Sequence, residues 1–494
     1  MQHQPLLAAL DLGSNSFRLQ IARVENDQLY MLDGLREPVR LAAGLGEDKI
    51  LDKAAQQRAL VCLQRFGERL RGLPQEAVRA VGTNSLRVAK NAPEFLQQAE
   101  AALGFPIDVI AGREEARLIY LGVAHGLPPS GANRLVMDIG GGSTEFIIGN
   151  GLHAAKLESL YMGCVSYSSR FFPGGEISKS NLKQAELAAL NELQTISGEF
   201  SKSHWHNALG SSGTAKAICE VLELNGFSQR GITRDGLERL RVQLLKAGDV
   251  TSLNLQGLRA DRLPVLPGGF AIMYAAFCEL GIEQMQPALG ALREGVLYDL
   301  LGRFHHHDMR DVTVAQFMRR YHVDARQAAQ VSHLAEKLAK QLLPKQTGFD
   351  FLHCLRQAAQ LHEIGISVAH SGYHKHTAYI LTNADMPGFT KQEQSRLGLI
   401  TLAHRGRLEK MRGLLNTPEL LVQVMALRLA ALIYRNRKEI KLPAMRVQFN
   451  SSKFHFSFPA NWFVKNPLTD TALQEEVRQW KTIGIVLQIS KGLS

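Results

Sequence analysis

The chain of 494 residues is longer than one hydrophobic core usually organises, which excludes a single-domain protein and predicts roughly two to four domains. Hydrophobic residues make up 45% and charged residues 21% of the chain, and this composition excludes a disordered or fibrous protein. Lysine and arginine total 57 against 46 aspartate and glutamate residues, and the formal net charge of +11 favours polyanionic partners.

The cysteines and the apolar runs bear on the cellular compartment. The five cysteines are scattered without a C-x-x-C pair, so neither a disulfide framework nor a structural zinc site is expected. The first apolar run is short and follows no basic segment, and no uncharged run approaches the roughly 20 residues of a membrane-spanning helix. We expect a cytoplasmic protein without a membrane span, and the sequence leaves peripheral membrane association open.

Two segments share a pattern of strand, polar glycine-containing turn and strand. The first carries Asp11-Leu-Gly-Ser-Asn-Ser-Phe17 after the apolar run that starts at Leu6. The second carries Asp138-Ile-Gly-Gly-Gly-Ser-Thr-Glu145 after the apolar run that starts at Leu135, and its aspartate follows the first by 127 residues. We interpret the recurrence as an internal duplication.

The residues between the two hairpins predict alternating helices and strands. Helical periodicity covers 53–71 and 93–103, and short β-branched strands are expected at 78–81 and 107–110. Each half of this region is therefore expected to be an α/β layer.

The pattern changes in the C-terminal part of the chain. From 312 to about 439, apolar residues recur at spacings of three and four, which predicts a helical domain. Alternation from 445, a helix at 470–480 and a strand near 483–489 predict a small α+β domain at the end.

The turns of the two hairpins have the chemistry of phosphate loops. A glycine-rich turn exposes backbone N–H groups to an anion, and a carboxylate at the end of the preceding strand can hold Mg²⁺ against phosphate oxygens. Either turn alone is more simply a tight β-turn, but two related copies favour phosphate binding. The residues concerned are Asp11, Gly13, Ser14, Asn15, Asp138, Gly140, Gly141, Gly142 and Ser143.

Paired hairpins of this kind resemble the phosphate loops of the superfamily that contains sugar kinases, heat-shock chaperone ATPases and actin. Within it, the order of motifs resembles the exopolyphosphatase and guanosine pentaphosphate phosphohydrolase (Ppx/GppA) family. Further motifs that carry this resemblance are Gly112-Arg-Glu-Glu-Ala-Arg-Leu-Ile119, Met162-Gly-Cys-Val-Ser166, Gly210-Ser-Ser-Gly-Thr214, Gly290-Ala-Leu-Arg-Glu-Gly295 and Leu361-His-Glu-Ile-Gly365. The resemblance covers nearly the whole chain.

The resemblance implies an α/β protein with two duplicated ribonuclease-H-like (actin-like) domains, at 1–124 and 125–302. An HD-like all-α domain at 303–440 and a small α+β domain at 441–494 would follow. His362-Glu363 resembles the His-Asp pair of metal-dependent phosphohydrolases, with His333 or His353 as the upstream histidine, but Glu363 stands in place of the aspartate. We expect the fold of that domain without its metal site.

The resemblance also implies catalytic roles. Glu115 would orient or deprotonate water, Arg87 would clamp phosphate, Glu145 would join Asp11 and Asp138 in holding Mg²⁺, and Gly213 would lie in a third phosphate loop. Without it, Glu114 and Glu115 are simply acids favoured in the first turn of a helix, and Arg87 is a surface arginine.

A basic stretch in the helical region offers a track for a linear polyanion. Its candidates are Lys375, His376, Arg405 and Arg407, and the alternative is an ordinary solvated helix face. No nucleic-acid partner is expected, because no binding motif occurs and aromatic residues are not interleaved with the basic ones.

The resemblance implies an exopolyphosphatase that uses Mg²⁺ to release terminal orthophosphate processively from inorganic polyphosphate. The alternative in the same family removes the 5′-terminal phosphate of guanosine pentaphosphate (pppGpp) to give ppGpp, and a different class is a non-hydrolytic phosphate or nucleotide sensor. No Walker P-loop occurs. The resemblance further implies a homodimer, and the need for a monovalent cation stays open.

Overall fold

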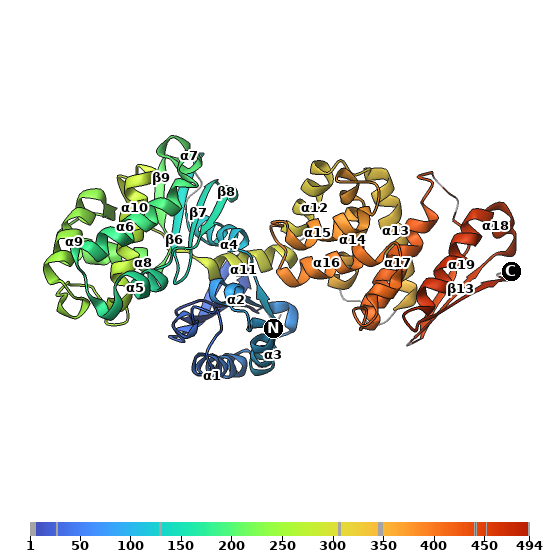
Figure 1. The fold of residues 1–494 in the computed structure, drawn as a ribbon, viewed down its shortest axis with the longest axis horizontal. Helices are drawn as coiled ribbons and strands as arrows, with labels where there is room; N and C mark the ends of the chain where they lie inside the picture. Colours follow the sequence, from blue (N-terminus) through green and yellow to red (C-terminus); the bar gives the residue numbers. More distant parts are fainter. Residues whose placement is uncertain are drawn as a thin grey trace. The chain divides into compact units, whose positions relative to one another are not determined.

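A computed structural model describes most of the chain. It contains two compact units, Met1–Asp308 and Met309–Ser494, each of which is considered by itself (Figure 1). The described residues are 6–25, 28–127, 131–304, 308–343, 349–438, 440, 442–450 and 452–492.

The first unit opens with a five-stranded mixed sheet in the order β3-β2-β1-β4-β5. Strand β1 pairs antiparallel with β2 and parallel with β4, while α1 and α3 pack together over a core centred on Phe66 and Phe95. Asp52 caps α1 through its side chain, which accepts from the N–H of Ala55. The elements are β1 (Leu6–Leu12), β2 (Phe17–Glu25), β3 (Gln28–Glu37), α1 (Lys53–Leu70), β4 (Val78–Gly82), α2 (Asn84–Val88), α3 (Ala92–Leu103), β5 (Ile107–Val109) and α4 (Gly112–His125).

A six-stranded sheet of the same design follows, in the order β10-β11-β9-β6-β7-β8. Strand β6 repeats the pairing of β1: antiparallel to the next strand, β7, and parallel to β9. The predicted duplication of an α/β layer is therefore confirmed. The elements are β6 (Arg134–Ile139), β7 (Thr144–Asn150), β8 (His153–Leu160), α5 (Cys164–Phe171), α6 (Lys179–Gln194), α7 (Ser197–Phe200), β9 (Asn207–Gly210), α8 (Gly213–Leu224), β10 (Ile232–Thr233), α9 (Arg234–Ala247), α10 (Leu266–Leu280) and β11 (Gln284–Pro287).

Helix α10 is the most apolar helix of this unit. Among the described residues, the stretch Leu263–Leu280 is the one long and apolar enough to cross a membrane, and 67% of it is buried. It packs against α5 and α6, and Phe270 and Phe277 are fully buried. The apolar side chains of α10 therefore form part of the core of the second α/β layer.

Helix α4 packs on β7 and β8 of the second sheet, helix α11 (Leu292–Phe304) packs on β1 of the first sheet, and the two helices cross closely (Figure 1). Glycine is required at the crossing, because a Cβ on Gly295 would lie 1.7 Å from the carbonyl oxygen of Leu118, and one on Gly122 would lie 2.1 Å from that of Ala291. The final stretch of the predicted second domain therefore packs on the first sheet.

A buried ion network fixes the first turn of α4. Arg117 binds Glu114 through two contacts of 2.8 Å and also pairs with Asp299 of α11, whose second oxygen lies 2.5 Å from Arg79 of β4. Buried charges are stable only when paired in this way, and removal of one partner typically costs about 3–5 kcal/mol. The network holds rigidly the helix turn that carries Glu115.

The second unit contains helices followed by a small sheet, as predicted. Strand β13 pairs antiparallel with β12 and parallel with β14. One core spans helices and sheet, because Phe454 and Trp480 belong to the same buried cluster as Leu338. The elements are α12 (Met309–Arg320), α13 (Ala325–Leu342), α14 (Phe349–Leu361), α15 (Tyr373–Asn383), α16 (Lys391–Ala403), α17 (Pro418–Ile433), β12 (Arg446–Asn450), β13 (Lys453–Phe458), α18 (Ala460–Lys465), α19 (Pro467–Lys481) and β14 (Val486–Lys491).

Two buried histidines meet in this core. The rings of His362 and His404 are 5.4 Å apart, and both side chains are at most 3% exposed. Burial lowers the pKa of His362 and, together with the nearby His362, holds the pKa of His404 well below its ordinary value. Both imidazoles are therefore neutral in the folded protein at neutral pH.

This burial predicts that the second unit loses stability in acid. Below about pH 6.5 the unfolded histidines bind protons that the folded ones do not, so the free energy of unfolding should fall by up to about 1.4 kcal/mol per pH unit for each histidine. Urea unfolding of a Trp205→Phe variant, in which Trp462 and Trp480 of the second unit report alone, measures this slope. His404→Gln should reduce the slope, and an equal slope in both proteins would contradict the prediction.

Candidate active site

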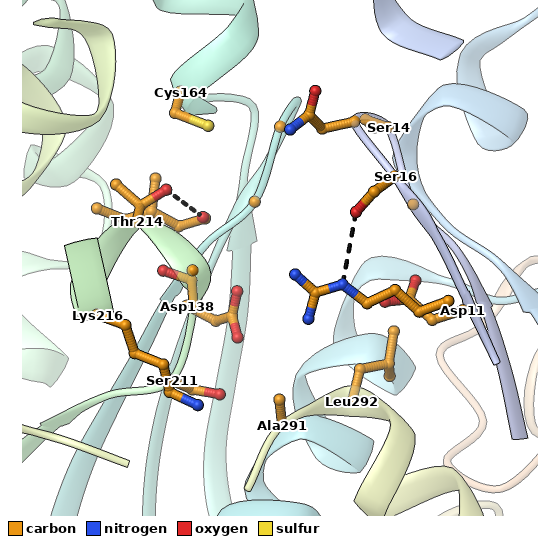
Figure 2. A pocket seen from close by; sticks show the side chains of 18 of the residues that line it. Asp11, Ser14, Ser16, Asp138, Cys164, Ser211, Thr214, Lys216, Ala291 and Leu292 are labelled. Atoms are coloured by element: carbon orange, nitrogen blue, oxygen red, sulfur yellow. Dashed lines mark hydrogen bonds between the residues drawn. The ribbon is translucent and has the colours of Figure 1, made fainter. Parts of the chain in front are cut away.

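A cavity of about 300 Å³ opens between the two α/β layers of the first unit. Its walls are the turns after β1 and β6, the first turn of α4, the loop before α8 and the start of α11. Figure 2 shows Asp11 and Ser14 on one side, and Asp138, Ser211 and Lys216 on the other. The two members of the duplication therefore face each other across one space.

Most of the predicted catalytic, metal-binding and phosphate-loop residues line this cavity, and two do not. Arg87 and Glu145 lie outside its lining. The predicted residues that line it are Asp11, Gly13, Ser14, Asn15, Glu115, Asp138, Gly140, Gly141, Gly142, Ser143 and Gly213.

The two glycine turns approach each other so closely that side chains would not fit. A Cβ on Gly141 would lie 2.9 Å from the Cβ of Ser14, and one on Gly142 would lie 2.3 Å from Oδ1 of Asn84. Glycine is required here for close approach and leaves the backbone N–H groups accessible.

The individual N–H groups of the second turn are not equivalent. The N–H of Gly140 donates to the carbonyl of Ser143 at 2.9 Å, so it closes the turn and is not available to an anion. Among the described residues, the N–H groups of Gly141 and Gly142 have no backbone acceptor. The expectation of a phosphate-binding amide at Gly140 is thus corrected, and Gly141 and Gly142 are the better candidates.

The duplicated hairpins place different charges at equivalent positions. Asp11 is directly opposite Arg18 in the β1–β2 pair, and Asp138 is directly opposite Glu145 in the β6–β7 pair. Glu145 is buried and accepts from the hydroxyl of Ser159 at 2.8 Å. One hairpin therefore brings a cation and the other a second carboxylate.

The carboxylates of the site are destabilised by burial and by one another. Burial raises the pKa of Asp11 to about 7, with Glu115 and Asp138 adding to the rise and Arg18 opposing it. Burial raises the pKa of Asp138 to about 6, and Glu115 contributes. Burial, Glu115 and Asp138 also hold the pKa of Glu145 well above its ordinary value. Such a cluster is stabilised by a bound cation.

The donor set fits Mg²⁺ held mainly by water and substrate. No group of three His, Cys, Asp or Glu side chains is arranged as a metal site in the described part of the chain. Asp11 and Asp138 nevertheless supply hard carboxylate oxygens on opposite walls of the cavity. Mg²⁺ usually takes one or two carboxylates and completes its octahedron with water and phosphate oxygens, so the chemistry of these two residues fits the ion.

Glu115 is held by Arg87. Nη1 of Arg87 lies 2.7 Å from Oε2 of Glu115 and donates to the carbonyl of Ile110 at 2.9 Å. Burial opposes the charge of Arg87, but the Glu115 carboxylate outweighs it and raises the pKa of the guanidinium. In this structure Arg87 holds the predicted base and is not part of the cavity lining.

The cavity also contains basic side chains to which the sequence analysis gives no role, and of these only Arg293 belongs to a quoted motif. Burial lowers the pKa of Arg18, with Arg293 as the next cause, and burial lowers the pKa of Arg262. A Cβ on Gly213 would lie 2.2 Å from Nη2 of Arg262, so this glycine makes room for the guanidinium. The basic residues of the lining are Arg18, Arg36, Lys216, Arg259, Arg262 and Arg293.

A signal for one of these residues was present in the sequence. The 127-residue offset that relates Asp11 to Asp138 also relates Arg18 to Glu145. Each of the two is directly opposite an aspartate of the cavity, so a charged residue at either position is a candidate for the site; Arg18 lines the cavity, and Glu145 lies outside its lining.

The predicted polyanion track lies in the second unit. Lys375, Arg405 and Arg407 are exposed, His376 is half-buried, and the guanidinium of Arg405 lies 5.0 Å from the ring centre of Tyr373. The exposure fits the track and a solvated helix face equally well. The track stays a prediction.

Glu363 and His353, which resemble residues of a metal-dependent phosphohydrolase motif, each contact another side chain of the chain. Oε1 of Glu363 lies 2.7 Å from Nη2 of Arg437, and Nε2 of His353 lies 2.6 Å from Asp311. His333 is exposed. The carboxylate beside His362 is thus neutralised by an arginine.

Comparison with known proteins extends over both units. The model for the Ppx/GppA phosphatase family matches residues 20–304, and the model for Ppx/GppA phosphatase, domain III, matches residues 309–477. A protein of Aeromonas hydrophila and one of Vibrio cholerae, both named guanosine-5′-triphosphate,3′-diphosphate pyrophosphatase, are 38% and 39% identical over 494 residues, with 98% of each chain covered.

Solved structures share the fold of part of the chain. An exopolyphosphatase from Cytophaga hutchinsonii gives a TM-score of 0.55 at 24% identity and covers 60% of this chain and 98% of its own. The PPX-GPPA enzyme of Aquifex aeolicus gives 0.50 at 26% identity and covers 60% of this chain and 99% of its own. With two facing phosphate-loop hairpins, family matches in both units and relatives this similar along its length, the chain belongs to the Ppx/GppA phosphatase family.

Proposed function

We propose that this chain hydrolyses the terminal 5′-phosphoanhydride of guanosine 5′-triphosphate 3′-diphosphate (pppGpp), releasing orthophosphate and leaving ppGpp. The observation that carries the proposal is full-length similarity to relatives named for this nucleotide. The membership of a phosphatase family supports the coarser statement of a hydrolase acting on phosphoric anhydrides. These findings favour the pppGpp alternative over the exopolyphosphatase expectation.

The cleft has the parts that the reaction requires. The oxygen of a water molecule attacks the terminal phosphorus, the bond from phosphorus to the bridging oxygen breaks, and one proton of the water must be accepted. Glu115 faces the cavity from the rigid first turn of α4 and is the acceptor we propose, with Arg87 orienting its carboxylate. Arg87 is thereby proposed as a positioning residue in place of the phosphate clamp expected from the sequence.

The surrounding charges suit a polyphosphorylated leaving group. Arg18, Arg262, Arg293 and Lys216 line the same cavity and can neutralise phosphate oxygens in a partly desolvated space. Burial lowers the pKa of Arg18 and of Arg262, and an anionic substrate would favour the charged form of both guanidinium groups.

Mg²⁺ is the cofactor we propose, with Asp11 and Asp138 as its protein ligands. When bound, it would screen the charge that develops on the phosphate oxygens. The buried Glu145 would act behind Asp138, since its hydroxyl partner Ser159 fixes it away from the cavity lining. The homodimer and the cytoplasmic location remain predictions.

Exopolyphosphatase activity is the second candidate, because polyphosphate ends in the same terminal anhydride and the chain carries an excess of basic residues. A cleft that recognises terminal phosphates would accept both substrates. The two activities therefore differ in what binds the remainder of the substrate.

The substrate assignment is tested by orthophosphate release from pppGpp and from long-chain polyphosphate, each with and without Mg²⁺. We expect Mg²⁺-dependent release from both, with a kcat/KM for pppGpp at least about tenfold higher per terminal phosphate. A higher kcat/KM for polyphosphate would restore the exopolyphosphatase assignment. Binding of either ligand without any release would identify a sensor and contradict the hydrolase.

The role of Glu115 is tested by Glu115→Gln, which keeps an acceptor for Arg87 and removes the base. We expect kcat to fall by about 100-fold or more while pppGpp binding is retained, because the side chain acts on water and not on the ligand. Glu94→Gln is the matched control, since Glu94 is also an acid in the first turn of a helix and is exposed. A Glu115→Gln enzyme as active as the Glu94→Gln control would show that another group takes the proton.

A further inference from the structure

The second unit contains a pocket of its own, of about 190 Å³, which is open to solvent on the side of its arginines. It lies among the beginning of α13, the turn after α14, the beginning of α15 and the C-terminal end of α17. The cavities of typical drug-sized ligands are about 300–1,000 Å³, so this one suits a smaller molecule. Neither the family matches nor the named relatives assign a ligand to it.

The exposed residues of this cavity are mainly cationic. Arg405, Arg435 and Arg437 line it, against a single carboxylate, Glu363. Arg437 already binds Glu363 at 2.7 Å. Arg435 has no ion-pair partner among the described residues, and Arg405 contacts only the ring face of an aromatic residue. Two guanidinium groups are thus left to attract an anion, for which arginine is well suited because of its planar fork of donors.

The buried residues of the cavity are hydrogen-bond acceptors. Gln327 is 4% exposed, and its Nε2 donates to the carbonyl of Tyr434 at 3.0 Å, which leaves Oε1 without a partner in the described structure. Nδ1 of His362 lies 2.6 Å from the carbonyl of Ala359 and must carry the hydrogen of this contact, so Nε2 is the acceptor. A buried acceptor without a donor is costly, and a ligand hydroxyl would satisfy it.

A metal ion does not suit this set of residues. The Glu363 carboxylate is held by Arg437, and the excess of guanidinium groups repels a cation. A linear polyanion does not suit it either, because an acceptor such as Gln327 Oε1 repels phosphate oxygens. The arginines and the buried acceptors together suit a molecule that has an anionic group at one end and hydroxyl donors at the other.

We propose that this cavity binds a sugar phosphate monoester, a pentose 5-phosphate or the ribose phosphate part of a mononucleotide. Its phosphate lies between Arg405 and Arg435, and its hydroxyl groups donate to Oε1 of Gln327 and Nε2 of His362. The proposal does not depend on the reaction in the first unit.

The test uses the full-length protein with histidine labelled at ¹³Cε1 and follows the His362 resonance, assigned by its loss in His362→Gln. This readout is local to the cavity and is not affected by phosphate binding in the first unit. The probes are ribose 5-phosphate, inorganic phosphate and ribose. We expect ribose 5-phosphate to shift the resonance with saturation, and to bind more tightly than either of its parts.

Three variants separate the proposal from simpler explanations. Arg405→Gln/Arg435→Gln should weaken ribose 5-phosphate binding by about tenfold or more. Lys340→Gln/Lys410→Gln is the matched control, because it removes the same charge from exposed residues outside the cavity lining and should leave binding unchanged. Gln327→Leu should abolish the preference for ribose 5-phosphate over inorganic phosphate.

The outcomes that overturn the proposal are equally specific. An unshifted His362 resonance at millimolar ribose 5-phosphate would show that the cavity does not take this class of ligand. Equal weakening in the two double variants would show a general charge effect. Equal affinity for ribose 5-phosphate and inorganic phosphate in the unmutated protein would contradict the role given to Gln327 and His362.

Discussion

The constraint on which the first unit depends is the repulsion among carboxylates gathered in one cleft. Asp11, Asp138, Glu115 and Glu145 approach each other in a partly buried space, and burial raises the pKa of three of them. Isolated buried charges would neutralise or unfold the site, so the surrounding structure must hold them in place. Two features provide that support. The buried ion pairs of Arg117 and Arg79 fix the first turn of α4, and glycine residues let α4 and α11 pack in close contact. Both fix the turn that presents Glu115.

Duplication explains how a single fold supplies opposite charges to one cavity. The two hairpins have the same pairing, but the residue directly opposite the aspartate is Arg18 in the first and the buried Glu145 in the second. The first hairpin therefore places a cation beside its aspartate, and the second places a further carboxylate there, as the proposed Mg²⁺–phosphate complex requires.

Much of the fold could be predicted from the sequence, because the apolar periodicity of a helix or strand depends only on residues that are close together in the chain. The two hairpins, helices α1 and α3 and the helical second unit follow directly from apolar periodicity. Strand β3 was not predictable in this way, because most of its residues are exposed or half-buried on an edge and show no clear apolar alternation. Tertiary contacts decided the rest: Glu114 and Glu115 are adjacent first-turn acids, yet one enters an ion network and the other the cavity, and Arg87 turned out to bind Glu115.

The central claim is that Asp11 and Asp138 hold a divalent cation that joins the substrate to the cleft. The most direct measurement is the affinity for pppGpp as a function of Mg²⁺ concentration, by calorimetry, in a Glu115→Gln protein that binds without turnover. Mg²⁺ should strengthen binding there, and adding Asp138→Asn should remove most of the Mg²⁺ dependence without weakening binding in its absence, because one repelling charge is lost. A Mg²⁺ dependence that is unchanged by Asp138→Asn would contradict the account.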